Sequence, residues 1–162
     1  MMAVERTLVL LKPDAVQRAL MGEIIQRLEK AGLKIVAMKM VWVDSDFAKK
    51  HYAEHVEKPF YPGLESLITM GPILAMTVEG VEAIATIRKM VGSTEPKSAA
   101  PGTIRGDYAH VSYGHADEKG IGIKNLIHAS ANESDAKKEI ALWFEDQEIH
   151  SYKTVHDMHI SE

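Results

Sequence analysis

Residues 6–40 read RTLVLLKPDAVQRALMGEIIQRLEKAGLKIVAMKM, and this stretch decides the fold. The apolar run at its start ends at Pro13 and predicts a strand that is buried on both faces. Between residues 22 and 33 the apolar side chains recur at helical spacing and Gly32 follows them, which predicts an amphipathic helix with a C-terminal glycine. Residues 34–44 predict a second strand, so the stretch is a strand–helix–strand unit.

The rest of the chain continues this alternation. After a cap at Asp44 or Ser45 we expect a helix that carries Phe47, His51 and His55 at four-residue spacing. The later elements are expected as a helix at about 60–70, a strand at 72–80, a helix at 81–92, a long irregular segment at about 92–122, a strand at 123–128 and a helix at 134–144. This order contains the split βαβ pattern. It predicts an α+β fold of ferredoxin-like type, βαββαβ, with an antiparallel four-stranded sheet covered by helices.

Composition restricts the class of protein. A chain of 162 residues with 46% hydrophobic residues can bury one core, so we expect a single domain over residues 1–162. The sequence has no cysteine, which excludes disulfides, thiolate metal sites and a thiol nucleophile. A net charge of −4 argues against nucleic acid or a membrane surface as the partner. The N-terminal apolar run is too short for a signal peptide or a membrane span, so we expect a cytoplasmic protein.

Several basic and polar residues stand where they are unusual. Arg88 interrupts the apolar stripe of the helix at 81–92, so it must meet a carboxylate, a carbonyl or a bound anion. Arg105 lies in PGTIRGD, where neighbouring glycines allow close approach of the backbone, and Lys12 ends the first strand. With Thr94 and Asn125 these residues suit a polyphosphate. Taken singly, Arg88 fits a structural ion pair as well as a bound anion, whereas a solvated turn is the favoured assignment for Arg105 and a snorkelling side chain the favoured one for Lys12. No Walker-type motif occurs, so side chains must bind any phosphate.

His128 stands at a corner between a strand and a helix, with Glu139 on that helix. A carboxylate bonded to one imidazole nitrogen leaves the other nitrogen free as an acceptor, which a nucleophilic histidine requires. The alternative is that His128 only finishes the strand and that Glu139 pairs with a lysine one turn away.

The segment His51–His55 reads HYAEH and fits the H-x-x-E-H pattern of inverted zinc peptidases. Such a site also needs a third ligand, for which His110 or His115 would be available, and a long supporting helix. Because the pattern is short and Pro59 follows within about a turn, this hypothesis ranks below phosphate binding.

Six stretches taken together resemble the nucleoside diphosphate kinases: ERTLVLLKPDAVQR, GEIIQRLEKAGLKIVAMK, HYAEHVEKPFYPGL, GPILAM, PGTIRGDY and NLIHAS. The resemblance runs in order from about Glu5 to Tyr108 and resumes from Asn125 to Phe144. It implies the ferredoxin-like core and transfer of the γ-phosphate of a nucleoside triphosphate, typically ATP, to a nucleoside diphosphate. The transfer would be ping-pong and would maintain the nucleoside triphosphate pools.

The resemblance also implies residue roles. His128 matches the histidine that becomes phosphorylated, and Glu139 matches the glutamate that orients its ring. Positions around the phosphates and ribose are matched by Lys12, Tyr52, Arg88, Thr94, Arg105 and Asn125. Phe60 matches the aromatic residue on which the base stacks, and stacking alone admits purines and pyrimidines alike. The implied cofactor is Mg²⁺, held mainly by the nucleotide phosphates and water, so no protein ligand to the metal is predicted.

Members of this family assemble as hexamers or tetramers, and residues 92–100 fall in a loop involved in that assembly. A homo-oligomer is therefore expected. The alternative to an enzyme is a regulatory protein that keeps the nucleotide pocket without catalysis.

The chain departs from the family pattern in two places. About 109–122 it carries an insertion of roughly ten residues, which we expect to form a surface hairpin or flap. Ala131 stands where many members have an acid, and Asn132 or Asp135 is the expected substitute near the metal–phosphate complex.

Overall fold

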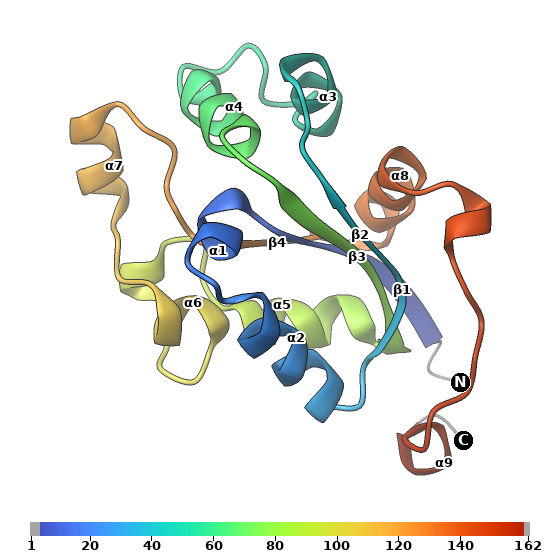
Figure 1. Ribbon diagram of the computed structural model, residues 1–162. Helices are drawn as coiled ribbons and strands as arrows, with labels where there is room; N and C mark the ends of the chain where they lie inside the picture. Colours follow the sequence, from blue (N-terminus) through green and yellow to red (C-terminus); the bar gives the residue numbers. More distant parts are fainter. Residues whose placement is uncertain (1–3, 161–162) are drawn as a thin grey trace.

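The computed structural model describes residues 4–160, which form one four-stranded sheet with helices on both faces (Figure 1). The strands are β1 (Val4–Leu11), β2 (Lys34–Val41), β3 (Ile73–Val81) and β4 (Ile127–Ala129). Their order is β2-β3-β1-β4, and each neighbouring pair is antiparallel. Since β1 and β2 both run antiparallel to β3 between them, they are parallel to each other, as the split βαβ pattern requires. The ferredoxin-like prediction is confirmed.

Two helix layers cover the sheet. The helices are α1 (Pro13–Gln17), α2 (Met21–Lys30), α3 (Ser45–His51), α4 (Tyr61–Thr69), α5 (Ala83–Val91), α6 (Ile104–Tyr108), α7 (Tyr113–Lys119), α8 (Glu133–Trp143) and α9 (Asp157–Ile160), with short 3₁₀ turns η1 (Pro96–Ser98) and η2 (Asp146–Glu148). Helices α2 and α5 lie on one face, and α3, α4 and α8 lie on the other (Figure 1).

The apolar run of β1 explains why the sheet needs both layers. Val9 and Leu11 belong to the core shared with α2 and α5, whereas Leu8 and Leu10 belong to the core shared with α3, α4 and α8. All four side chains are fully buried. Successive strand residues point to opposite faces, so a strand without polar alternation must be covered on both sides.

Helix α3 is shorter than predicted. Asp44 caps it, since the Asp44 carboxylate accepts a hydrogen bond from the backbone N–H of Phe47 at 2.8 Å. The helix ends at His51 and residues 52–57 form turns, so His55 does not lie on the helix as the spacing predicted. The chain does not extend the helix. Residues 52–60 instead form turns and a bend that lead past Pro59 to α4.

The segment 92–122 is more regular than predicted, because it contains η1, α6 and α7. The expectation of a β-hairpin at 109–122 is wrong: Ser112 caps α7 and Gly120 ends it with a positive φ of 62°. The returning chain passes close to Gly63, where a Cβ added to Gly122 would lie 2.5 Å from the Gly63 carbonyl oxygen. Glycine at both positions therefore allows the backbones to touch.

None of the helices within residues 4–160 is long and apolar enough to cross a membrane.

Candidate active site

A cavity of about 610 Å³ collects the polar residues that the sequence singled out. Its lining includes Lys12, Tyr52, Phe60, Arg88, Thr94, Arg105, Asn125 and His128. These residues come from α5, α6, β4 and from loops such as the one that follows β1, so segments far apart in the sequence meet here. Glu139 stands behind His128, outside this lining.

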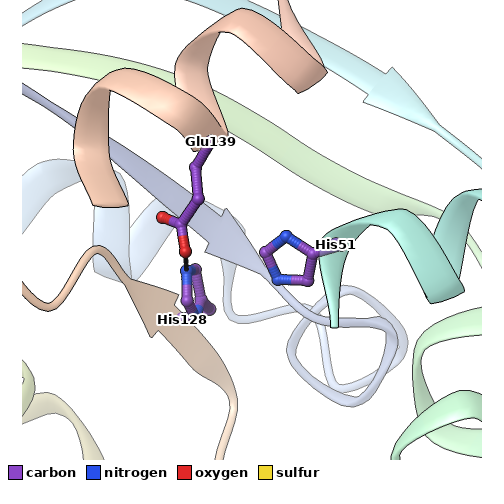
Figure 2. A group of neighbouring side chains, drawn as sticks. All are labelled: His51, His128 and Glu139. Carbon is purple, nitrogen blue, oxygen red and sulfur yellow. Dashed lines mark hydrogen bonds and ion pairs between the residues drawn. The ribbon is translucent and has the colours of Figure 1, made fainter. Parts of the chain in front are cut away.

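His128 and Glu139 are in direct contact (Figure 2). The Nε2 atom of His128, on β4, lies 3.0 Å from Oε1 of Glu139, on α8. The second carboxylate oxygen accepts a hydrogen bond from the Ser130 hydroxyl at 2.5 Å. Ser130 is itself fixed, because its hydroxyl accepts the backbone N–H of Leu8 from β1 at 3.2 Å. The alternative was that His128 only finishes the strand and that Glu139 is an exposed helix charge. Such residues would not form this chain of contacts.

The ionisation of Glu139 sets the tautomer of His128. Burial raises the pKa of Glu139, but the hydrogen bond and charge of His128, the Ser130 hydroxyl and nearby His51 outweigh it, and the net pKa lies below its usual value. An ionised carboxylate only accepts hydrogen bonds, so it holds the proton on Nε2 of His128. The Nδ1 atom is then left with a free lone pair.

His51 packs against this pair. Its ring stands edge-on to the ring of His128, with centroids 4.9 Å apart. The indole N–H of Trp143 donates to Nδ1 of His51 at 3.1 Å, while Nε2 of His51 is buried and has no partner. Burial, followed by the neighbouring His128, lowers the pKa of His51 to about 3, so this ring is neutral.

Lys12 is buried rather than snorkelling, with 6% of its surface exposed. Its ammonium donates to the Asn125 side-chain oxygen at 2.8 Å. Burial and the positive charge of Arg105 lower its pKa to about 8, against the opposing effect of Asp14. Such a cation is poorly compensated by the protein itself and is suited to an incoming anion.

Arg105 is held by three backbone carbonyls, not solvated in a turn. Its Nε and its two terminal nitrogens donate to Asn125, Gly92 and Ile127 at 3.1, 3.2 and 2.5 Å. Burial, with the charge of Arg88 next, lowers its pKa to about 10. The guanidinium has five N–H donors, so two remain for another acceptor.

Arg88 makes only a long contact of 3.5 Å to the carbonyl oxygen of Ala129. Within the described residues 4–160 no carboxylate forms an ion pair with Arg88, so the ion-pair alternative for this helix position is not supported. Most of its donors are therefore available toward the cavity.

The loop before β4 is shaped by contacts that the sequence did not reveal. The carboxylate of Asp14 accepts the N–H of Leu126 at 3.0 Å, and the carbonyl of Leu126 accepts the N–H of Lys12 at 2.8 Å. Leu126 has a φ of 73°, which is costly for a residue with a Cβ. Asn125 is also tied down, because its amide donates to the carbonyl of Thr94 at 2.9 Å. Tertiary contacts thus force the strained corner that places Asn125 in the cavity.

Phe60 is half-exposed at the cavity mouth, with 52% of its surface accessible, and its ring centroid lies 5.6 Å from that of His55. The other side of the mouth is formed by the 109–122 segment, through Tyr113, Asp117 and Ile121. The Tyr52 ring packs edge-on against His51 with centroids 4.7 Å apart. The 109–122 segment is therefore part of the cavity wall.

The zinc-peptidase hypothesis fails on geometry. His55 faces Phe60 and does not join a group with His51, and neither His110 nor His115 supplies a third ligand among residues 4–160. The expected substitutes for the acid at Ala131 are also engaged elsewhere, since Asn132 caps α8 by accepting the N–H of Asp135.

Sequence reasoning missed Ser130, Asp14 and the contact of His51 with His128. Only HYAEH drew attention to His51, and for a different reason. Ser130 and Asp14 carried no signal, because their partners lie 122 and 112 residues away in the chain.

Comparison with known proteins identifies the family. The family model described as nucleoside diphosphate kinase matches residues 5–149. The nucleoside diphosphate kinase of Pyrococcus furiosus is 54% identical over 149 residues, which cover 92% of this chain and 88% of that protein. The enzyme of Borreliella burgdorferi is 48% identical over 158 residues, 94% of each chain.

Two solved structures are similar over nearly the whole chain. One is a transition-state mimic of the Borrelia burgdorferi kinase with bound vanadate and ADP, with a TM-score of 0.96, 45% identity and 99% of each chain covered. The other is the halophilic kinase of Halobacterium salinarum in complex with CDP, with a TM-score of 0.88, 44% identity, and 99% of this chain and 100% of that chain covered. This chain belongs to the nucleoside diphosphate kinase family.

Proposed function

We propose that this protein transfers the γ-phosphate of a nucleoside triphosphate, typically ATP, to a nucleoside diphosphate through a phosphohistidine at His128. The observation that carries the proposal is the bond of 3.0 Å between His128 Nε2 and Glu139, at the wall of a cavity lined by Lys12, Arg88 and Arg105. The free Nδ1 is the nucleophile, and the three cations are placed to bind the phosphates.

The first half-reaction follows from this arrangement. Nδ1 attacks the γ-phosphorus, the N–P bond forms, and the bond from that phosphorus to the bridging oxygen of the β-phosphate breaks. The electron pair leaves on the nucleoside diphosphate. Glu139 holds the proton on Nε2 and stabilises the positive charge that develops on the ring. A second nucleoside diphosphate then enters and its terminal oxygen takes the phosphoryl group from His128, which completes a ping-pong cycle.

The basic residues have distinct tasks in this proposal. Arg105 fixes the loops through three carbonyls and offers its two remaining N–H groups to phosphate oxygens. Arg88 offers more donors, because its one protein contact is long. Lys12 places a buried ammonium near the transferred group, where a low-dielectric site strengthens its attraction.

The base is proposed to stack on Phe60, which lies at the cavity mouth and is free to receive a ring. Tyr52, Thr94 and Asn125 line the inner part, beside the proposed path of the sugar and phosphates. The 109–122 segment forms the opposite wall, so we propose that it acts as the flap over the base.

Magnesium is the proposed cofactor. The charged and polar groups that line the cavity are mainly cations and neutral donors, and Asp117 of the flap is the one carboxylate in its described lining. That donor set suits a nucleotide-bound Mg²⁺ that keeps its waters, not a protein cage for a bare ion. Bound with the nucleotide, Mg²⁺ would neutralise part of the phosphate charge.

We also propose a cytoplasmic homo-oligomer, a hexamer or a tetramer, with nucleoside tri- and diphosphates as ligands and without a nucleic-acid or membrane partner. Met38, Met40 and Trp42, on or just after the edge strand β2, are 53%, 53% and 68% exposed. Apolar side chains gathered on a sheet edge support association with a second copy. Analytical ultracentrifugation of Met40→Glu against the parent tests this surface.

One assay separates the enzyme from a non-catalytic regulatory protein: turnover of ATP with GDP in the presence of Mg²⁺. The parent should form GTP, and labelled ATP should leave an acid-labile, base-stable phosphoprotein. His128→Ala should do neither, while His150→Ala, a histidine outside the cavity, should behave like the parent. Labelling of His128→Ala at the parent level would refute the assignment.

A further inference from the structure

We propose that His51, His128 and Glu139 form a binding site for Zn²⁺, through which this ion inhibits phosphorylation of His128. Each residue offers one ligand atom, and the three atoms lie within 4.8 Å of one another. Figure 2 shows the three side chains converging from α3, β4 and α8. Among the residues that the structure describes, this is the one such group of histidines and acids.

The donor set suits zinc. Structural and catalytic zinc sites use imidazole nitrogens and carboxylate oxygens at about 2.0–2.2 Å. The 3.0 Å between His128 Nε2 and Glu139 Oε1 is close to the edge of a zinc tetrahedron of about 3.3 Å that those bond lengths imply. A zinc ion can therefore take the place of this hydrogen bond once the Nε2 proton has moved to Nδ1 of the same ring, and the His51 ring has to move closer.

The His51 ring is oriented to bind a metal ion. Its Nε2 atom is buried without a partner, which is an unusual state for a polar atom. The Trp143 indole donates to Nδ1 and so orients the ring, as the hydrogen-bond partners around metal sites orient their histidines.

A second cavity adjoins the three ligand atoms. It measures about 430 Å³, is lined by His51, His128 and Glu139 together with Glu54 and Asp135, and shares part of its wall, including His128, with the nucleotide cavity. Its carboxylates suit the approach of a cation. Mg²⁺, which prefers six oxygen ligands and keeps its waters, should not compete for two imidazoles.

The consequence for catalysis rests on the proposed function. With zinc on the Nε2 lone pair, the neutral ring carries its proton on Nδ1, so Nδ1 has no lone pair with which to attack the γ-phosphorus. Phosphorylation should slow, and a chelator should restore it.

Binding is tested first and without nucleotide, so that its outcome does not depend on kinase activity. The full-length protein is titrated with Zn²⁺ by calorimetry, and with Co²⁺ as a spectroscopic substitute whose visible absorption becomes intense on tetrahedral coordination. We expect one class of site for the parent, unaffected by excess Mg²⁺. Loss of even an outer partner of a metal site costs roughly 10–100-fold in affinity, so His51→Gln and Glu139→Gln should each weaken binding at least about tenfold.

The control is His150→Gln, a histidine that belongs neither to this group nor to the lining of either cavity. It should bind Zn²⁺ like the parent. Equal affinity of the parent and both ligand variants, with thermal melting showing all three folded, would overturn the site. Zinc binding without any slowing of His128 phosphorylation would overturn the inhibition while leaving the kinase assignment intact.

Discussion

Replacing Glu139 by glutamine tests the part of the site on which the proposed chemistry depends most. The change keeps the shape of the side chain and removes its charge. The Glu139 side chain is 17% exposed, so water screens its bond to His128 only partly. A glutamine amide can also donate to Nε2, which would put the ring proton on Nδ1 and block the nucleophile.

The magnitude follows from the kind of bond that is lost. A hydrogen bond to a charged group contributes about 1.5–3 kcal/mol and a neutral one about 0.5–1.5 kcal/mol, so the exchange removes about 1–2 kcal/mol. If that energy is lost in the transition state, phosphorylation of His128 slows about 5- to 30-fold. Nucleotide affinity should change little, because Glu139 does not line the nucleotide cavity.

Rapid-quench measurement of phosphohistidine formation from ATP gives the rate and the apparent affinity separately. The control is Glu133→Gln, on the same helix, which removes an exposed pair with Lys137 and should leave the rate unchanged. If Glu139→Gln is phosphorylated as fast as Glu133→Gln, the carboxylate does not orient His128 and the reasoning is wrong.

Three further predictions concern pH, the base and the support of the site. The pKa of Lys12 is about 8, and its charged form is the one proposed to bind phosphate, so kcat/KM should fall as the pH rises through about 8. Lys12→Arg should move this fall to higher pH. A flat profile between pH 7 and 9 would exclude a phosphate-binding role for the Lys12 ammonium. Phe60→Ala should raise KM about tenfold for purine and pyrimidine nucleotides alike and change kcat little, since stacking of the base contributes about 1–3 kcal/mol. Steady-state kinetics on ATP and CTP check this. An effect on one base alone would mean that the protein reads base edges. Ser130→Ala should lower the free energy of unfolding by about 1–3 kcal/mol in urea titrations, because the N–H of Leu8 and one oxygen of Glu139 lose their partner. Ser134→Ala, at an exposed position in the first turn of α8, should leave the free energy of unfolding unchanged.

Glu139 also links stability to pH. Its pKa in the folded protein lies below its ordinary value, so its contribution to stability is complete above the unfolded-state pKa and is lost as the pH falls through the folded-state pKa. Acid unfolding of the parent should therefore be steeper than that of Glu139→Gln, as circular dichroism can measure. Parallel acid transitions would contradict the assigned ionisation.

Much of the architecture was accessible before the structure, because burial leaves a periodic mark on the sequence. The unbroken apolar run of β1 required two covering layers, and both layers are present. Errors fell where short-range contacts compete with periodicity. Helix α3 stops at His51 although the four-residue spacing continues to His55, and α7 forms in a segment whose glycines suggested irregular chain.

The candidate site divides in the same way. Lys12, Arg88 and Arg105 stood out because a cation at a strand end, in an apolar stripe or between glycines demands a partner. The sequence did not predict which groups these cations contact. Arg105 donates to three backbone carbonyls, and Lys12 donates to a side-chain amide oxygen.

The sequence by itself determined the alternation of strands and helices and, through long ordered motifs, the family, and it singled out the basic residues that line the cavity. The contact of Glu139 with His128 was implied by the resemblance and is present in the fold. Tertiary structure alone decided that Ser130 donates to Glu139 and that His51, 77 residues from His128 in the chain, packs against the His128 ring. Local periodicity reports which face of an element is buried, but it carries no information about which distant side chain will be buried beside it. The proposed nucleophile, His128, is therefore singled out by a motif, whereas its geometry depends on contacts that exist only in the folded chain.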